Sequence, residues 1–381
     1  MNPALRMLKP YPMVELQRRK QKLREAGGEL FDFGTGDPVE PTPPAIRQAL
    51  IDAIPEVSQY PTVAGTPALR QAIAAYLQRR FNVSLDPDSA VIPSAGSKEA
   101  IFHLPLAFLD PSSSKDTVIY GTPGYPVYEA GTLFAGGRCH PVVLRAESGF
   151  RLDLAGLPAE LLDRSAIAWI NYPHNPTGVG VDRAYLASQA AIAQKHGILL
   201  VADECYTDLW FDADAPAPPS LLEIGQEGLL IVHSCSKRSG MTGYRSGFIA
   251  GDPRLVTEYR RWRAAMGVGS PAFVEAAATA AWSDDQHVQE RRRTFAAKYQ
   301  LLRDGLQLRG HQVWESPAGL YLWASVPGGM TSAAWAQRCL DAGIVISPGD
   351  FFGEGGEGWF RLALVPGLAD CQRALERWPQ S

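Results

Sequence analysis

The sequence predicts an α/β protein whose large domain is a mostly parallel sheet flanked by helices, joined to a smaller α+β domain. From about residue 45 to 250, short apolar segments alternate with helical segments. Strands that are apolar on both faces and separated by helices are typical of a parallel sheet covered on both sides. From about residue 252 this alternation ends. The 381 residues, 46% of them hydrophobic, are sufficient for two domains with separate cores.

The predicted large domain contains six strand candidates, each a short apolar run that ends in polar or turn-forming residues. In chain order they are "AVIPS", "TVIYG", "IAWINYP", "ILLVADE", "LLIVHS" and "SGFIAG". Between them, residues 97–109 and 184–197 have helical patterns, and Gly197 is a typical helix C-terminus. The proline-rich stretches 37–44 and 213–220 are predicted loops, because proline interrupts both helices and central strands.

The predicted smaller domain begins with a long helix over 285–310. It continues with "YLWASV", the helical "SAAWAQRCLDAG", then "IVISPG" and "WFRLAL". We expect residues 45–265 to form the large domain, and residues 1–44 and 266–381 to form the smaller one. The arginines of "RRR", residues 291–293, are expected on a solvated face of the long helix.

The composition argues against several classes of protein. The net charge is -4 and the basic residues are scattered, so neither a nucleic-acid footprint nor a membrane patch is expected. The five cysteines are odd in number and contain no C-x-x-C, which argues against a disulfide framework and a metal site and favours a reducing cytoplasm. The start "MNPALRMLKPYPMVEL" lacks a signal-peptide core, and no apolar run is long enough to span a membrane.

The ends of the predicted strands carry polar residues, and ligands bind outside the carboxyl ends of the strands in such sheets. Gly96 and Ser97 open a helix whose free N–H groups favour an anion, although Ser97 could equally be an ordinary N-cap. Tyr125 could stack on a planar ligand or merely pack. Asn175 could donate a hydrogen bond into the crevice or only stabilise its turn.

Asp203 ends a strand so apolar that its carboxylate needs a partner. It could hold a protonated nitrogen, or it could be an N-cap or half of a structural ion pair. Tyr206 lies three residues further on and could reach the same crevice. Glu204 and Asp208 are expected to be surface or helix-start acids.

The stretch after "LLIVHS" carries Ser234, Ser236, Lys237 and Arg245. Hydroxyl groups with a guanidinium suit a phosphate dianion. A lysine beside them in a partly desolvated crevice has a lowered pKa, which makes it a candidate nucleophile towards a carbonyl.

Two chemistries compete for these residues. A pyridoxal-phosphate enzyme would use all the strand ends. Lys237 would take the aldehyde, Asp203 would keep the ring nitrogen protonated, Asn175 and Tyr206 would bind the phenolic oxygen, and Tyr125 would stack on the ring. A serine acyl-transfer enzyme would use "SCSK" as S-x-x-K, but the S-D-N and K-T-G partners of that class are absent. A binding or scaffold protein would leave this cluster without a purpose.

Several motifs resemble the fold-type I aminotransferases of the aspartate aminotransferase superfamily. They are "FGTGDP", "YPTVAGTPALRQAIA", "SAGSKEAIF", "NYPHNPTG", "ADECYTDLWF", "SCSKRSGMTGYRSG", "SPAGLYLW" and "SPGDFFGEGGEGWFRLAL", in the order of the family. The resemblance implies the seven-stranded fold of pyridoxal-phosphate transferases and a homodimer with shared active sites. It implies that Tyr60 reaches the phosphate of the neighbouring subunit's cofactor, that Lys98 follows the phosphate turn, and that Gly36 and Arg361 meet the substrate carboxylate.

Within the superfamily, the sequence looks most like the succinyldiaminopimelate aminotransferases of lysine biosynthesis. "MNPALRMLKPYPMVEL", "DECYTDLWFD", "SKRSGMTGYRSGFIAGD" and "AAWSDDQHV" carry this likeness. It implies transamination of N-succinyl-LL-2,6-diaminopimelate with 2-oxoglutarate and glutamate. A broad aspartate, alanine or aromatic aminotransferase of the same superfamily is the alternative.

Overall fold

The computed structural model describes residues 1–8, 20–21, 25 and 28–380, so residues 9–16 of the quoted N-terminal segment lie outside the described residues. Its central feature is a seven-stranded sheet with the strand order β2-β8-β7-β6-β5-β3-β4. In chain order the strands are β2 (Val91–Ser94), β3 (Thr117–Thr122), β4 (Arg138–Val143), β5 (Ser165–Asn171), β6 (Leu199–Asp203), β7 (Leu229–Ser234) and β8 (Gly247–Gly251).

The sheet is mostly parallel, as predicted. Within it only β8 runs antiparallel to its neighbours β2 and β7, whereas β3, β4, β5, β6 and β7 pair in parallel. All six strand candidates are strands. The seventh, β4, was missed: it is a partly exposed edge strand that contains Pro141, and such strands lack the apolar run that identifies a buried strand.

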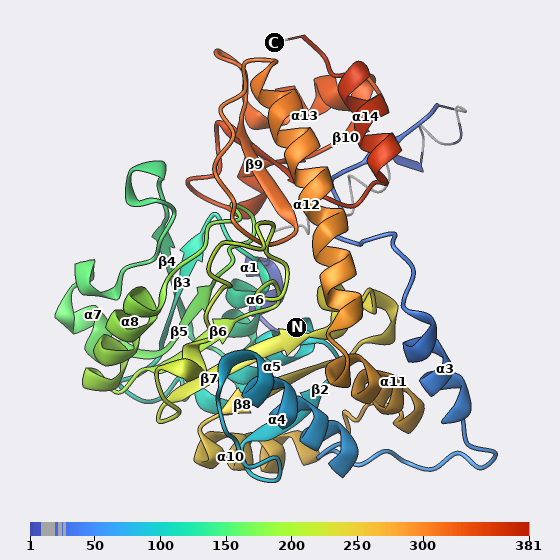
Figure 1. Cartoon of the computed structure of the whole chain (residues 1–381). Helices are drawn as coiled ribbons and strands as arrows, with labels where there is room; N and C mark the ends of the chain where they lie inside the picture. Colours follow the sequence, from blue (N-terminus) through green and yellow to red (C-terminus); the bar gives the residue numbers. More distant parts are fainter. Residues whose placement is uncertain (9–19, 22–24, 26–27, 381) are drawn as a thin grey trace.

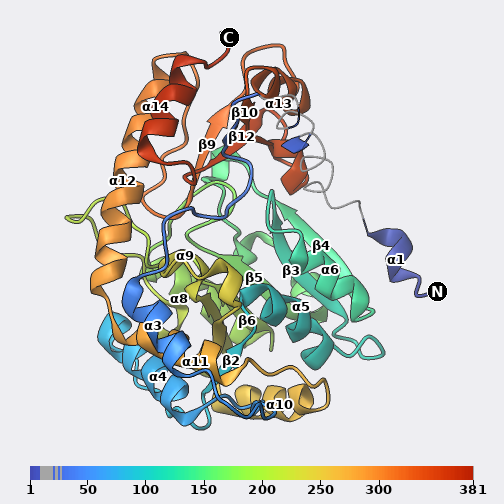
Figure 2. The same ribbon diagram turned by 90° about the vertical axis from the view of Figure 1, so that its right-hand side faces the viewer.

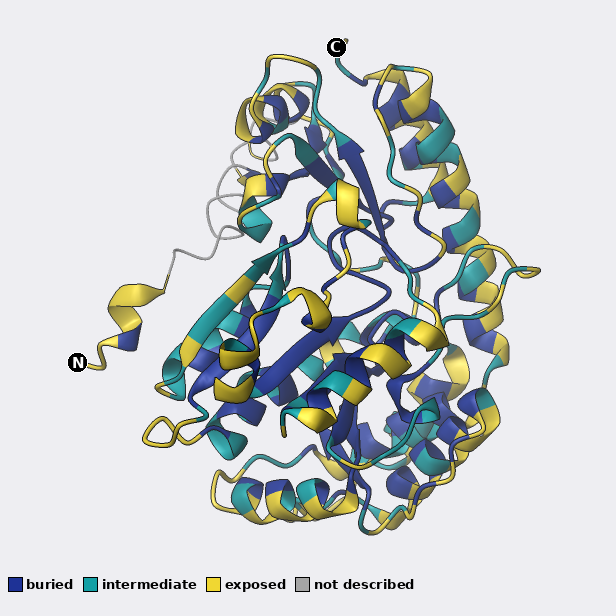
Figure 3. Cartoon of the chain, turned by 90° about the vertical axis from the view of Figure 1, so that its left-hand side faces the viewer, coloured by how far each residue is buried: buried dark blue, intermediate teal, exposed yellow. Residues whose placement is uncertain are grey.

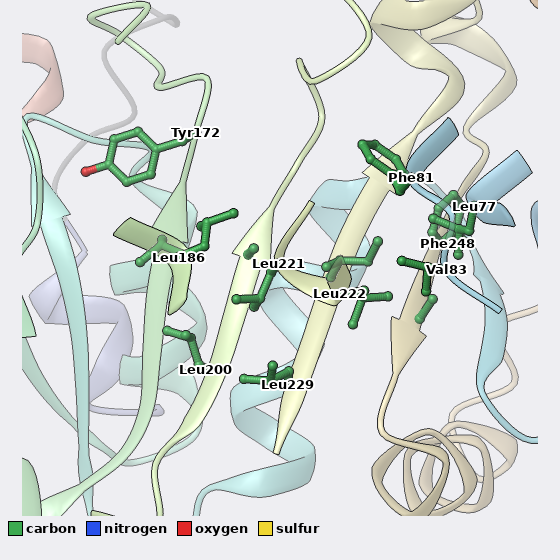
Figure 4. Packing of buried hydrophobic residues seen from close by; sticks show 14 of the residues in the cluster. Leu77, Phe81, Val83, Tyr172, Leu186, Leu200, Leu221, Leu222, Leu229 and Phe248 are labelled. Atoms are coloured by element: carbon green, nitrogen blue, oxygen red, sulfur yellow. The ribbon is translucent and has the colours of Figure 1, made fainter. Parts of the chain in front are cut away.

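Helices cover both faces of this sheet (Figure 1, Figure 2). One face packs on α4, α8 and α11, and the other on α5, α6 and α10. Successive residues of a strand contribute to opposite cores; Leu200 belongs to the first core and Val201 to the second, which explains the uninterrupted apolar runs. Figure 4 shows part of the first core, which includes Leu77 and Phe248. The helices up to the end of this region are α1 (Ala4–Met7), α3 (Pro44–Asp52), α4 (Pro67–Phe81), α5 (Ser97–Phe108), α6 (Val127–Phe134), α7 (Ala159–Arg164), α8 (Arg183–Lys195), α9 (Cys235–Arg238), α10 (Pro253–Ala264) and α11 (Ala272–Ser283).

A second core lies around a three-stranded antiparallel sheet, β11-β12-β9. The long helix α12 (Gln286–Gln307) runs from beside α11 to this sheet (Figure 1). The other elements are β9 (Tyr321–Ser325), α13 (Ser332–Asp341), β10 (Ile344–Val345), β11 (Ser347–Pro348), β12 (Trp359–Ala363) and α14 (Leu368–Glu376). The N-terminal strand β1 (Phe31–Asp32) pairs in parallel with β10. Except for the edge strand β4, the strands are mostly buried, while most helices expose one face (Figure 3).

The expected boundary at residue 265 remains a proposal, and α11 bears on where it lies. Ala277, Ala278, Ala281 and Trp282 of α11 belong to the core of the large sheet, against α4. We therefore propose that the large domain extends to the start of α12. Among the described residues, no helix combines the length and the apolar character needed to cross a bilayer.

The expectation that residues 291–293 form a solvated face is wrong for the first two arginines. Arg291 is buried, and its Nε donates to the carbonyl of Lys237 at 3.2 Å. Arg292 is partly buried, with its guanidinium over the ring of Trp210. Only Arg293 is exposed. A run of charged residues predicts a solvated face, but an arginine can bury its apolar stem when its guanidinium donates to carbonyls or stacks on aromatic rings.

Candidate active site

A cavity of about 600 Å³ lies at the carboxyl ends of β5, β6 and β7, next to residues of β12 and of the segment that follows β1. It contains most of the side chains that the sequence singled out. They are Gly36, Ser97, Lys98, Tyr125, Asn175, Asp203, Tyr206, Ser234, Ser236, Lys237, Arg245 and Arg361. Parallel strands bring their carboxyl ends to one edge, so residues far apart in the sequence meet there.

Lys237 lies on the single helical turn of α9, which follows β7 directly. Its Nζ donates to the carbonyl oxygen of Gly36. Desolvation in the crevice lowers the pKa of the Lys237 amine to about 8, and the attraction of Asp37 only partly offsets this effect. The amine is therefore partly neutral near neutral pH, which is what attack on a carbonyl requires.

Asp203 is the last residue of β6 and is buried. The hydroxyl of Tyr128 donates to its Oδ2 at 2.9 Å, and the N–H of Cys205 to its Oδ1 at 3.3 Å. Burial raises the pKa of this carboxyl, although both donors act against the shift. The ionised form would be stabilised by a cation placed against it, such as a protonated ring nitrogen.

Sequence reasoning overlooked Tyr128 as a partner of Asp203. It lies on α6, three residues after Tyr125, and its ring stacks on Trp169. Of these two tyrosines, Tyr125 lines the cavity. The sequence around Tyr128 gives no signal that its hydroxyl will bond a carboxylate 75 positions later.

An anion-binding cradle occupies one end of the cavity. α5 begins at Ser97 with Gly96 as its N-cap, so the predicted N-cap at Ser97 was one residue too late. Gly96 has a φ of 85°, and a Cβ there would lie 2.5 Å from Arg245 Nη2. The missing side chain lets the guanidinium approach the free N–H groups of the helix N-terminus. Ser234 Oγ lies 2.9 Å from Ser236 Oγ on the facing turn.

Arg361 lies at the other end, on β12. Its Nη1 donates to Asn175 Oδ1 at 2.8 Å and its Nη2 to the carbonyl of Gly34 at 3.0 Å. Its Nε is buried without a hydrogen-bond partner. A buried guanidinium with a free donor fits an incoming carboxylate.

Tyr321 is a cavity residue that the sequence did not reveal. Its hydroxyl lies 3.0 Å from that of Tyr206, and its ring packs under the guanidinium of Arg361 at 4.2 Å. A Cβ on Gly36 would lie 2.6 Å from the Tyr321 hydroxyl, so the backbone at Gly36 approaches the cavity closely. Tyr321 opens β9, and the apolar run there indicated only a strand.

Tyr60 is fully exposed and does not line the cavity of its own chain. Its contact with the cofactor of a neighbouring subunit stays a prediction.

Two acidic residues have another place than expected. The prediction that Glu204 and Asp208 are surface acids is wrong, since they are 2% and 1% exposed. Glu204 accepts hydrogen bonds from the N–H of Leu221 and from Ser220, and burial raises its pKa to about 8. The hydrogen bonds of the Glu204 and Asp208 carboxylates hold the segment that follows β6 in place.

The comparisons with known proteins agree on one family. The model of "Aminotransferase class I and II" matches residues 28–377. The LL-diaminopimelate aminotransferase of Desulforudis audaxviator is 38% identical, over 98% of this chain and 95% of that protein. An aminotransferase from Neisseria meningitidis has a TM-score of 0.91 and 34% identity, over 99% of this chain and 98% of that one. A probable N-succinyldiaminopimelate aminotransferase from Thermus thermophilus has a TM-score of 0.89 and 27% identity, over 96% of this chain and 98% of that one.

The cofactor of this family is pyridoxal phosphate, and the cavity fits it chemically. An anion cradle, an amine of lowered pKa and a buried carboxyl lie around one space, as a phosphorylated pyridine aldehyde requires. The alternatives of a serine acyl-transfer enzyme and of a scaffold protein are wrong. The chain belongs to the class I and II aminotransferases and is a pyridoxal-phosphate-dependent enzyme.

Proposed function

We propose that this enzyme transfers the amino group of a diaminopimelate-type amino acid to 2-oxoglutarate, with Lys237 as the reacting amine. The observation that carries the proposal is a lysine of lowered pKa in the same cavity as a buried carboxyl and an incompletely bonded arginine. When bound, pyridoxal phosphate supplies an aldehyde and an electron-withdrawing ring. The residues around it hold, orient and exchange protons.

The cofactor-binding residues divide by the part of the molecule they hold. The phosphate group suits the cradle, with the exposed Tyr60 contributed by a second subunit and Lys98 beside it. With the cofactor bound, Asn175 and Tyr206 would hydrogen-bond its phenolic oxygen, Tyr125 would stack on the ring, and Asp203 would accept a hydrogen bond from the protonated ring nitrogen. The phosphate cradle consists of Gly96, Ser97, Ser234, Ser236 and Arg245.

Lys237 has two tasks. Its neutral amine would hold the cofactor in the resting enzyme and would give way to the amino group of the substrate. Lys237 Nζ then takes the proton from the α-carbon of the substrate. The lowered pKa serves both tasks, since a permanently charged amine could neither attack nor accept a proton.

Arg361 binds the α-carboxylate of the substrate. Its unpartnered Nε and the nearby Asn175 and Gly36 support this role. Because Arg361 is already held by Gly34 and stacked on Tyr321, little side-chain entropy is lost when the substrate binds. The same site receives amino donor and oxo acid in turn, which gives ping-pong kinetics.

The enzyme is proposed to act as a homodimer in the cytoplasm. The segment before α4 presents large apolar side chains to solvent: Ile51, Ile54, Val57 and Tyr60 are between 54% and 102% exposed. Such a row of apolar side chains is typical of a surface that another chain covers. A second copy would bring Tyr60 to the neighbouring cavity.

Two forms of the substrate have separate support. The likeness of the sequence to succinyldiaminopimelate aminotransferases, and the probable N-succinyldiaminopimelate aminotransferase of T. thermophilus, favour the N-succinyl form. The name of the D. audaxviator relative favours free LL-diaminopimelate. The cavity also favours the free form, because Asp37 lines it and its carboxylate would attract the distal ammonium group, which the N-succinyl form lacks.

A substrate panel tests the proposal. We expect kcat/KM with 2-oxoglutarate to be highest for one of the two diaminopimelate forms, and lower for aspartate, alanine and phenylalanine. Borohydride should fix the cofactor on Lys237, as peptide mass spectrometry would report. A preference for aspartate would refute the substrate, and label on another lysine would refute the site.

A further inference from the structure

Lys237 and Arg238 are consecutive residues with opposite surroundings. Lys237 faces the cavity, whereas Arg238 is 1% exposed in the core behind it. They share α9, a helix of four residues. One helical turn has little stability of its own, because nucleation of a helix is unfavourable. The position of the Lys237 amine therefore depends on the contacts that hold this turn from outside.

The guanidinium of Arg238 supplies the strongest of these contacts, since it makes five hydrogen bonds. Nε donates to Asp208 Oδ2 at 2.6 Å, and Nη2 to Asp285 Oδ1 at 2.6 Å. Three more bonds run from Nη1 and Nη2 to Ala281 O, Ser239 Oγ and Asp284 O. The cation also lies 5.0 Å from the ring centre of Tyr76 and 4.8 Å from that of Trp282. A planar fork with five satisfied donors fixes both the place and the orientation of its helix.

Asp208 connects this anchor to the other half of the site. It lies five residues after Asp203, on the segment that also carries Tyr206. Tyr76 donates to Asp208 Oδ2 at 3.0 Å and Arg80 to Oδ1 at 3.2 Å, so the carboxylate is fully bonded. Burial alone would raise the pKa of Asp208, but the charge of Arg238 holds it well below its usual range. The ion pair is therefore intact throughout the working pH range.

A second contact runs parallel to the first. The imidazole Nδ1 of His233 accepts from the N–H of Ser234, at the start of the same turn, at 2.8 Å. Its Nε2 lies 3.1 Å from the hydroxyl of Tyr76, which donates to Asp208. Burial lowers the pKa of His233 to about 4, so the ring is neutral and Nδ1 can act as an acceptor. The start of the turn is therefore linked to Asp208 through His233 and Tyr76, and its end is linked to the same carboxylate through Arg238.

We propose that Arg238 is a positioning residue that, through Asp208, sets the distance between the Lys237 amine and the segment of Asp203 and Tyr206. The inference rests on the proposed roles of Lys237 and Asp203. Proton transfer at the α-carbon requires Lys237 and Asp203 to serve the same bound molecule from two different strand ends. The pair of Arg238 and Asp208 joins the two segments directly by a charge-assisted bond. The neighbouring Arg291 and Arg292 of α12 join them only indirectly, through the carbonyls of Lys237 and Asp208.

The test uses the holoenzyme, four variants of the pair and one control variant. Arg238→Met removes the guanidinium, Arg238→Lys keeps its charge without the fork, and Asp208→Asn removes the other partner. The double variant Arg238→Met/Asp208→Asn deletes both charges, so the net charge of the layer is unchanged. Arg79→Gln is the matched control, because Arg79 pairs with the same Asp285 at 2.6 Å but from the surface.

Two measurements distinguish positioning from general stability. The first is the pH titration of the visible absorbance of the holoenzyme. The second is the half-reaction with L-glutamate, in which the limiting rate constant and the apparent Kd are separated. We expect Arg238→Met to lower the limiting rate constant about 10-fold or more and to change the Kd less than about 3-fold, because a misplaced catalytic group costs rate rather than binding.

We expect Arg238→Lys to recover part of the rate, the double variant to be no slower than Arg238→Met, and Arg79→Gln to match the wild type. Such non-additivity would show that Arg238 acts through Asp208. If Arg238→Met does not fold, Arg238→Lys and the double variant still decide, since neither leaves Asp208 as an unpaired buried charge.

The inference is overturned if these variants keep the wild-type titration and limiting rate while only their melting temperature falls. It is overturned together with the proposed function if borohydride labels a lysine other than Lys237 in the wild type. The two failures are therefore distinguishable.

Discussion

The cavity and the layer of charges behind it contain the same kinds of side chain in opposite states. In the cavity, burial lowers the pKa of Lys237 and raises that of Asp203, and Arg361 Nε has no acceptor. Behind it, Arg238 makes five hydrogen bonds, and the Asp208 carboxylate has its pKa held low by its partners. The two layers meet at α9, where the side chain of Lys237 lines the cavity and that of Arg238 lies in the layer behind it.

The difference indicates where each layer contributes. Groups that a ligand is to bond are held without full compensation, which costs stability in the absence of that ligand. Groups that hold the site in shape are compensated by each other, and removing one partner leaves a buried charge unpaired. Substitutions in the cavity should therefore lower activity without lowering stability, whereas substitutions in the layer behind it should lower stability as well.

The largest expected effect is at Lys237. Lys237→Met should lower kcat about 10³-fold or more, because it removes the group that we propose as both nucleophile and base. It should not lower the melting temperature of the cofactor-free protein, since the replaced amine is poorly solvated and its pKa is depressed. Calorimetry and steady-state kinetics on the same preparation check both parts. A clear loss of stability would mean that Lys237 belongs to the compensated layer.

The two aspartates near the end of β6 give the sharpest comparison. The pKa of Asp203 is raised in the folded protein, so its ionised form destabilises the cofactor-free protein above pH 4, and Asp203→Asn should maintain or increase stability. The pKa of Asp208 is lowered, so its charge stabilises the fold above pH 4, and this contribution is lost as the pH falls through the folded-state pKa. Asp208→Asn should cost about 3 kcal/mol, as breaking a buried ion pair does.

Activity should separate the same two variants. Asp203→Asn should lower kcat about 10²-fold, because it removes the carboxylate that stabilises the charged ring. Urea unfolding at pH 7 and kinetics at one temperature provide the measurements. If both asparagine variants destabilised the protein equally, the distinction between the two layers would be incorrect.

Most of the fold could be predicted because the residues of its buried strands form continuous apolar runs in the sequence. Each strand of the central sheet except β4 is an apolar run, since residues such as Leu200 and Val201 face opposite cores. β4 was missed because an edge strand with Pro141 has no such run. The side of the domain boundary to which α11 belongs stays a proposal, because its alanine-rich sequence does not reveal which sheet it packs on.

The candidate site could be predicted only where it lies at strand ends. Asp203 ends an apolar strand, and Asn175 and Lys237 lie in the turns that follow two others, so topology brings the three together. Asp208 and Arg291 were expected at the surface, because charged residues without a strand before them usually are exposed. Their burial depends on partners far away in the sequence, such as Tyr76 for Asp208, and a single sequence shows no pairing of that kind.

A smaller effect concerns pH. The capture of pyridoxal phosphate by the cofactor-free enzyme requires a neutral Lys237 amine. With a pKa of about 8, the capture rate should rise with pH up to about 8 and then level off. An unperturbed lysine would give a rise that continues to about pH 10.4. Stopped-flow absorbance measures the rate, and Lys237→Met is the control in which it disappears. A rise that continues above pH 10 would place Lys237 in an ordinary aqueous environment.

The smallest expected effect is at Tyr128, which lies at the boundary of the two layers. Its hydroxyl donates to Asp203 at 2.9 Å, and its ring stacks on Trp169 in the core. Tyr128→Phe keeps the ring and removes one hydrogen bond to a carboxylate, so kcat should fall about 2- to 10-fold, with the melting temperature nearly unchanged. Phe102→Leu, a substitution beside the same sheet face away from Asp203, is the control for packing. If Tyr128 contributes only through packing, Tyr128→Phe should leave kcat at the wild-type value. If its hydrogen bond supports the ionised form of Asp203, Tyr128→Phe should cause no further loss of kcat when it is combined with Asp203→Asn, because the hydroxyl then has no carboxylate to stabilise.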